Sequence, residues 1–204
     1  MKSKTQYLGF IAGVSLALSG LGHASIVSFI DVDIPIATTF GGTSVNLETG
    51  AFANTDSLAG ADVNFFFGGT GISNDADVAL ASPTFQPIRT GTGNTDTVDN
   101  RGLGTTVSGA NTFSTGFGGS SDHIGSTFTA GVPGYIGFSL QSDDFGLVFG
   151  WLEVTLNPNT SEGTIHSWAF DTTGASIIVG AVPEPSSALL AALGSSLLLL
   201  RRRR

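Results

Sequence analysis

The sequence predicts an all-β protein, an antiparallel β-sandwich or jelly-roll-like domain with a hydrophobic helical segment at each end. Short runs in the body alternate apolar and polar residues with a period of two, which is typical of strands. No window there combines good helix formers with apolar residues at three-four spacing. The chain holds 29 glycines in 204 residues, and glycine-rich turns between many short strands favour a sandwich or jelly roll. A small barrel is the alternative.

The clearest strand pattern lies in the last seventy residues of the body. The predicted strands span 134–142, 145–156, 163–170 and 175–180. Ser142-Asp143-Asp144 supplies a turn between the first two, and 157–163 supplies a longer turn between the next two. Three successive turn-linked strands predict an antiparallel meander, with a fourth strand after the turn at 172–174.

Six further strands are predicted upstream, so that about ten strands build the two sheets. They span 26–34, 62–67, 77–81, 84–89, 104–108 and 126–129. The body from residue 25 to 180 has the length of one ordinary domain. Fourteen of the 15 phenylalanines lie in it, and we expect most of them to form its interior.

Residues 1–24 have the layout of a secretory signal peptide. Lys2 and Lys4 precede an uncharged, mostly apolar run from residue 8 to 21. Gly22 and Ala24 then place small residues before a cleavage site between Ala24 and Ser25. The run is too short to span a bilayer comfortably. We therefore expect export through the Sec translocon and removal of this segment.

Residues 181–204 form a second segment of distinct composition. The motif Pro183-Glu184-Pro185 breaks any preceding strand or helix and leaves the acid extended. An uncharged run at 186–200 follows, which as a helix would be about 22 Å long. It ends in four cations, Arg201, Arg202, Arg203 and Arg204. The arginines would stay on the cytoplasmic side of the membrane, so the helix at 186–200 is expected to be a membrane anchor.

These three parts in this order resemble the PEP-CTERM sorting signal of Gram-negative bacteria. The matching residues are Pro183, Glu184 and Pro185, with Arg201 to Arg204 as the basic end. The resemblance implies recognition and processing of the tail by exosortase, a membrane-embedded enzyme, after export by the Sec route. It also implies transient anchoring in the inner membrane. Proteins with this tail are linked to the cell surface and to exopolysaccharide or biofilm matrix, and their bodies differ widely.

A second resemblance covers about fifty residues before the tail. The segments 135–138, 149–154 and 165–170 are similar to a recurring extracellular module of PEP-CTERM proteins. In that module a strand containing Trp151 and a strand containing Trp168 precede the tail. The group has no established catalytic residues, so the resemblance implies no enzymatic activity.

The body carries an unusually acidic charge balance. The whole chain has a net charge of −8, but six of its eight cations lie in the two terminal segments. Between residues 25 and 182 only Arg89 and Arg101 oppose fifteen acids, and 2 − 15 = −13. Such a body repels phosphate, so a nucleic-acid-binding function is excluded as the default.

Cysteine chemistry is excluded because the chain contains no cysteine.

Ser120, Asp122 and His123 suggest a catalytic triad by residue type. Near neighbours in sequence cannot supply the geometry of a triad, so a solvated turn is the better interpretation. The other histidine of the body, His166, is expected on the same strand face as Trp168. There it would be a partly exposed member of a cross-strand pair.

Two kinds of acidic site remain as hypotheses. Glu153 lies beside Trp151 on a predicted strand, but a glycosidase needs a second carboxylate that the sequence does not identify. Oxygen ligands suited to calcium group in loops or at strand ends, at 31–33, 75–77, 94–100 and 143–144, and the leading candidates are Asp75, Asp77, Asp96 and Asp99. Asx turns explain the same residues without a metal. No other cofactor is expected.

The sequence therefore predicts an exported surface or extracellular-matrix protein with a structural or adhesive role, and not an enzyme. The alternative is a lectin-like module that binds exopolysaccharide, with Tyr135, Trp151 and Trp168 on an exposed face as the stacking platform. A hydrolase of matrix polysaccharide is the third hypothesis. It would need a groove lined by two acids with separated pKa values.

Overall fold

The computed structural model describes residues 26–74, 85–91, 96–114, 127–157 and 161–183. Within these ranges the chain forms antiparallel sheets and no α-helix, and the helical structure there is one 3₁₀ turn, η1 (Phe67–Gly69). The all-β prediction is confirmed for this part of the chain. The predicted signal and anchor helices lie outside the described residues.

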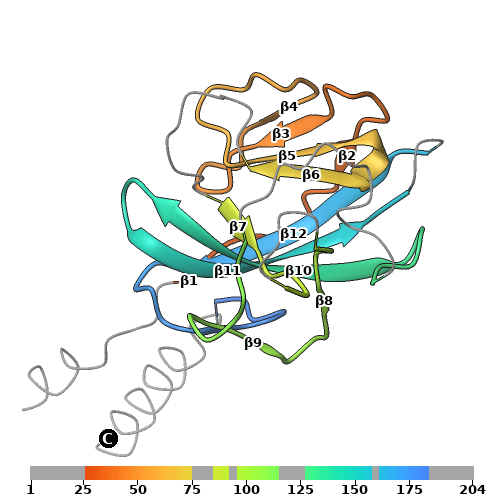
Figure 1. The fold of residues 1–204 in the computed structure, drawn as a ribbon. Helices are drawn as coiled ribbons and strands as arrows, with labels where there is room; N and C mark the ends of the chain where they lie inside the picture. The colour runs from red at the N-terminus through yellow and green to blue at the C-terminus, as the bar shows by residue number, and fades with distance from the viewer. Residues whose placement is uncertain (1–25, 75–84, 92–95, 115–126, 158–160, 184–204) are drawn as a thin grey trace, which may run out of the picture.

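A meander of three long strands forms the centre of the fold (Figure 1). β10 (Pro133–Ser142), β11 (Gly146–Thr155) and β12 (Gly163–Asp171) match the predicted strands to within one residue at each end. The predicted turn after β10 is also present. The Ser142 hydroxyl accepts hydrogen bonds from the backbone N–H groups of residues 144 and 145, at 3.2 and 3.0 Å.

Short strands extend the meander on both sides into a seven-stranded sheet. On the β12 side it gains β1 (Ile26–Phe29) and β2 (Ile34–Ile36), which pair with different parts of β12. On the β10 side it gains β7 (Phe85–Pro87) and β8 (Asn100–Arg101). Both edges of the meander are therefore paired by segments from the first half of the chain.

A four-stranded sheet packs on one face of the seven-stranded sheet (Figure 1). Its order is β4-β3-β5-β6, with the bounds β3 (Thr43–Val45), β4 (Phe52–Ala53), β5 (Val63–Phe66) and β6 (Gly71–Asn74). The larger hydrophobic cluster draws buried side chains from both sheets, among them Phe65 and Phe138. This cluster is the main core, and it excludes water from one face of the meander.

Trp168 of β12 joins that core to the loop after β3. Its side chain is 0% exposed, and its indole Nε1–H donates to the Leu47 carbonyl oxygen at 2.8 Å. Phe29 of β1 stacks on the indole with ring centroids 4.7 Å apart. The buried indole N–H therefore has a partner, as a fully buried tryptophan requires.

A two-stranded sheet covers part of the opposite face of the meander. β9 (Thr106–Val107) pairs with β13 (Ile177–Ile178), and a second hydrophobic cluster around Trp151 lies beneath them. The predicted fourth strand at 175–180 thus exists as a shorter strand. It leaves the meander after β12 and pairs with β9.

The predicted strand at 26–34 is in fact two strands separated by a break. Asp31 and Asp33 have φ angles of 55° and 46°, in the left-handed region that aspartate tolerates better than most residues. The break lies opposite an irregularity in β12, where Glu153 pairs with Ser167 but Val154 pairs with Ile165. His166 is the extra residue of this β-bulge.

The remaining upstream predictions have mixed outcomes. The strands predicted at 62–67, 84–89 and 104–108 exist in shorter form as β5, β7 and β9. No strand forms at 127–129, although Phe128 packs against the core, and 77–81 lies outside the described residues. Six phenylalanines are buried as expected: Phe65, Phe66, Phe85, Phe138, Phe149 and Phe170. Three others are exposed: Phe40, Phe52 and Phe145.

We predict that Trp168→Ala lowers the free energy of unfolding by about 3–5 kcal/mol, because it opens a cavity in the main core and leaves the Leu47 carbonyl without its indole donor. Urea unfolding followed by circular dichroism measures this change. Leu147→Ala at an exposed position of β11 is the control, with an expected loss below about 1 kcal/mol. Equal midpoints for the two variants would contradict the role of Trp168.

Candidate functional site

The three aromatic residues proposed as a carbohydrate platform do not share an exposed face. Trp151 and Trp168 are 2% and 0% exposed, and only Tyr135 is half-buried. In the register of the sheet Trp168 pairs with Leu152, so its side chain lies on the face opposite that of Trp151. The prediction of one outward-facing aromatic set is therefore wrong, because strand alternation separates the two indoles.

Tyr135, Trp151 and Glu153 do come together on one face of the sheet. The Tyr135 ring meets the Trp151 indole edge-on, with centroids 6.1 Å apart. Its hydroxyl donates to Glu153 Oε1 at 3.1 Å. Burial raises the pKa of Tyr135, and the hydrogen bond to Glu153 and the negative charge of that residue raise it further. The phenol is therefore held in its neutral, donating form.

A second polar group lies further along the same face, at the end of β11. His166 Nδ1 lies 2.7 Å from Asp33 Oδ1, and His166 Nε2 lies 2.8 Å from Thr155 Oγ1. The side chains of His166 and Asp33 are 28% and 66% exposed, and Thr155 is half-buried. The three groups form a hydrogen-bonded chain from a carboxylate through an imidazole to a hydroxyl.

The bulge in β12 and the break before β2 bring these groups together. The bulge turns His166 away from the core that holds Ile165 and Trp168, toward the face of Thr155. The Val32 N–H donates to the His166 carbonyl at 2.9 Å, which fixes the break against the bulge. The Asp31 N–H donates to the Ser167 hydroxyl at 3.1 Å. The expectation that His166 shares a face with Trp168 is wrong. His166 is partly exposed as expected, but as the extra residue of the bulge it lies outside the pairing register of β11 and β12, and it contacts β11 through its side chain.

The sequence suggested Asp33 only as a possible calcium ligand beside Asp31, and it did not single out Thr155. Asp33 lies 133 residues from His166, so no local spacing connects them. The available signal was the pair of aspartates inside an interrupted apolar alternation, since aspartate is enriched where a strand must adopt a positive φ. The residues Ser120, Asp122 and His123 lie outside the described residues.

The calcium candidates divide between described and undescribed positions. Asp75 and Asp77 lie outside the described residues. Asp99 forms an ion pair with Arg101 at 2.9 Å, and the Asp96 carbonyl accepts a hydrogen bond from Arg89 at 2.6 Å. Within the described part of the chain, no three His, Cys, Asp or Glu side chains are grouped to hold a metal ion.

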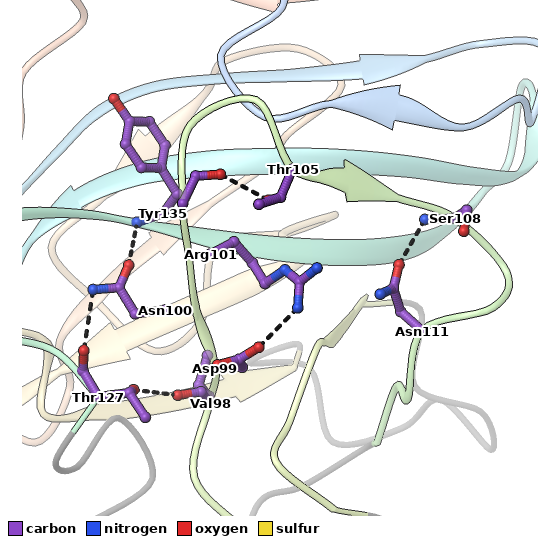
Figure 2. Close-up of polar contacts among 10 residues, drawn as sticks. Val98, Asp99, Asn100, Arg101, Thr105, Ser108, Asn111, Thr127 and Tyr135 are labelled. Carbon is purple, nitrogen blue, oxygen red and sulfur yellow. Dashed lines mark hydrogen bonds and ion pairs between the residues drawn. The ribbon is translucent and has the colours of Figure 1, made fainter.

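The segment around Asp99 is fixed by interactions within the protein. Figure 2 shows Asp99 pointing toward Arg101. Asn100 donates to the Thr127 carbonyl at 3.1 Å and accepts from the Tyr135 N–H at 3.0 Å. Arg89, only 3% exposed, packs behind this segment, and burial lowers its pKa while Asp96 opposes that effect. Both cations of the body thus hold the segment that contains Asp96 and Asp99.

The structure covers little of the two terminal signals. Pro183 is described and exposed. Glu184, Pro185, Arg201, Arg202, Arg203 and Arg204 lie outside the described residues, as do Ala24 and Ser25. Among the residues that are described, no helix has both the length and the apolar character needed to cross a membrane.

No family model, curated protein or solved structure matches this chain. The resemblance of the tail to the PEP-CTERM signal therefore rests on its own residues.

We predict that Glu153→Gln lowers the pKa of Tyr135, because the amide removes the negative charge that opposes ionisation of the phenol. Burial keeps the pKa above its ordinary value of about 10. Near-ultraviolet absorbance of tyrosinate measures the titration, in a Tyr7→Phe background that leaves Tyr135 as the single tyrosine. An unchanged titration midpoint would contradict the contact between Tyr135 and Glu153.

The same raised pKa has a consequence for stability. Folding favours the neutral phenol, so its stabilising effect is complete below pH about 10 and declines as the pH rises through the folded-state pKa. Tyr135→Phe lacks this ionisation and should therefore lose less stability than the parent between neutral and alkaline pH.

Proposed function

We propose that this chain is an exported structural or adhesive protein of the cell surface or extracellular matrix, sorted through a PEP-CTERM tail. The residues that support the proposal lie at its two ends, and the charge of the body agrees with it. With the terminal segments excluded, the body has two cations and no lysine. A large net negative charge favours solubility and repels anionic polymers that the domain does not bind.

The observation that best supports a separate tail is the way the domain ends. The indole Nε1–H of Trp151 donates to the Ala181 carbonyl oxygen at 3.1 Å. Two residues earlier, Val179 is buried and donates its N–H to the Thr105 carbonyl at 2.8 Å. Val182 and Pro183 are already exposed. Packing therefore continues to Ala181, and the proposed sorting motif begins two residues later.

The proposed domain is a two-sheet β-sandwich with a jelly-roll-like arrangement. The main core between the seven-stranded and four-stranded sheets supports this class, because two sheets that pack face to face over one core define a sandwich. Such a domain buries its apolar residues without disulfides, in keeping with the absence of cysteine.

The proposed partners act on the ends of the chain. The Sec translocon would export it, and signal cleavage would separate Ala24 from Ser25. The segment 186–200 would anchor it transiently in the inner membrane, with Arg201 to Arg204 on the cytoplasmic side. Exosortase would then recognise the motif that begins at Pro183.

We predict that replacing Pro183 and Glu184 together by alanine blocks tail processing and leaves the precursor in the inner membrane. The readout is cell fractionation with immunoblotting of precursor and mature forms. The control is Ser186→Ala with Ser187→Ala, which changes two neighbouring tail residues and keeps the motif. Normal processing and surface display of the first variant would overturn the sorting assignment.

A second candidate function is binding of exopolysaccharide on the face that carries Tyr135 and Glu153. The observation that favours it is the neutral phenol paired with a carboxylate beside Trp151, since hydroxyl and carboxylate groups bind sugar hydroxyls. The buried position of Trp151 restricts any ring stacking there to Tyr135.

We predict that a glycan array binds the exported chain through this face, and that Glu153→Gln with Tyr135→Phe weakens binding at least about tenfold, the effect of losing about 1.4 kcal/mol. The array is probed with and without calcium. Asp144→Asn at an exposed turn is the control. Absence of binding under both conditions would leave the structural role as the conclusion.

A further inference from the structure

We propose that Asp33, His166 and Thr155 form a nucleophilic site that hydrolyses small carboxylic esters through a threonyl ester. The observation that carries this proposal is the hydrogen-bonded chain, with 2.7 Å from Asp33 Oδ1 to His166 Nδ1 and 2.8 Å from His166 Nε2 to Thr155 Oγ1. The site does not include the sorting tail, so failure of one proposal would not contradict the other.

With a neutral imidazole, the chemistry of the groups gives each hydrogen bond a direction. A carboxylate only accepts, so the Nδ1 atom that faces Asp33 must carry the hydrogen. In a neutral imidazole the other nitrogen is then the acceptor, and the Thr155 hydroxyl donates to it. A hydroxyl that donates to a histidine oriented by a carboxylate is the arrangement that activates a nucleophile in acyl transfer.

The three groups also converge from separate parts of the fold, as such a site requires. Asp33 comes from the β1–β2 connection, Thr155 from the end of β11 and His166 from the bulge in β12. β2 begins directly after Asp33 and pairs with β12, which in turn pairs with β11, so the three segments adjoin in one sheet. The order along the chain is acid, hydroxyl and base, and geometry, not order, identifies a triad.

The backbone around the site departs from regular strand geometry in both of the strand segments that carry Asp33 and His166. Asp33 itself has a φ angle of 46°, and Asp31 has one of 55°. Non-glycine residues in this region cost free energy and cluster at functional sites, and bulges re-aim side chains beside active sites. Here both irregularities position Asp33 and His166, because the Val32 N–H, next to Asp33, donates to the His166 carbonyl in the bulge.

The position of the site indicates the class of substrate. The imidazole and carboxylate are partly exposed and Thr155 is half-buried, which suits a small acyl group presented on a larger, solvent-exposed alcohol. Glu153 lies two residues from Thr155 on the same face and bonds the Tyr135 hydroxyl. These flanking polar groups can bind hydroxyls of the alcohol, so acetyl esters of polyhydroxylated compounds are the expected substrates.

The proposed reaction has two balanced halves. In the first, Thr155 Oγ1 bonds to the ester carbonyl carbon and its proton passes to His166 Nε2. The tetrahedral adduct then collapses, the ester C–O bond breaks, and the leaving alkoxide takes the proton from Nε2. In the second, water attacks the threonyl ester with His166 as base, which releases the carboxylic acid and restores the hydroxyl. Asp33 orients the imidazole and offsets its positive charge throughout.

The test uses the full chain and p-nitrophenyl acetate as the probe. Release of p-nitrophenolate reports turnover, and peptide mass spectrometry of a quenched reaction locates any acetyl group. We predict acetylation at Thr155, and a loss of at least about 100-fold in rate for His166→Ala and for Thr155→Val, the usual contribution of a general base and its nucleophile. Thr106→Val, a strand threonine in β9 outside the site, is the matched control and should keep the parental rate.

The conservative variant Thr155→Ser separates a catalytic role from a structural one. It keeps a hydroxyl that can donate to Nε2 and removes a methyl group, so it should retain acetylation and hydrolysis. Thermal unfolding monitors the fold of every variant. Hydrolysis by folded Thr155→Val at the parental rate would overturn the proposal, as would acetyl groups found only at lysines or the amino terminus. If Thr155→Val does not fold, the other variants still test the proposal. A folded Thr155→Ser chain without activity would overturn it, and so would a folded parental chain without activity.

Discussion

The structure depends on one constraint, that the β10–β12 meander is apolar on both faces. Ile136 and Leu152 face the main core, while Phe149 and Trp151 face the opposite side. Both faces of such a sheet must be covered, because an uncovered face would expose a large apolar area to water. The four-stranded sheet covers one side and the β9–β13 pair the other. With no cysteine in the chain, this double burial takes the place of covalent cross-links as the source of stability.

The bulge in β12 interrupts this apolar pattern and places a polar side chain between two residues that face the core. Ahead of it Ile165 faces the core, and after it Trp168 and Phe170 do the same, so the extra residue His166 can face outward without disturbing the core. A regular strand would have directed either His166 or Trp168 to the wrong side, since alternation has a period of two. The bulge thus permits a buried indole and a solvent-facing imidazole two residues apart.

The limits of sequence reasoning follow from the range of the interactions. The meander could be predicted almost to the residue because β10, β11 and β12 are long, alternate regularly and are joined by local turns. Strands β3, β4, β6 and β8 escaped prediction because their two to four residues carry no extended apolar alternation. Pairing with distant segments decides such strands. The contact from Asp33 to His166 spans 133 residues and depends on a bulge that leaves no pattern of its own. The apolar alternation also misassigned Trp168, because its prediction assumed an unbroken strand.

The proposed sorting through the tail and the proposed ester hydrolysis depend on different parts of β11, and the two functions are therefore compatible. Trp151, in the middle of β11, donates a hydrogen bond to the Ala181 carbonyl and so fixes the chain against the sheet just before the proposed tail. Thr155, at the end of β11, lies beyond the cover supplied by β9 and β13 and remains half-exposed. Processing of the tail would leave the β2–β12 end of the sheet unchanged. An exported protein of this design would therefore present its outward-facing hydroxyl, imidazole and carboxylate to the matrix whether it stays anchored or is released.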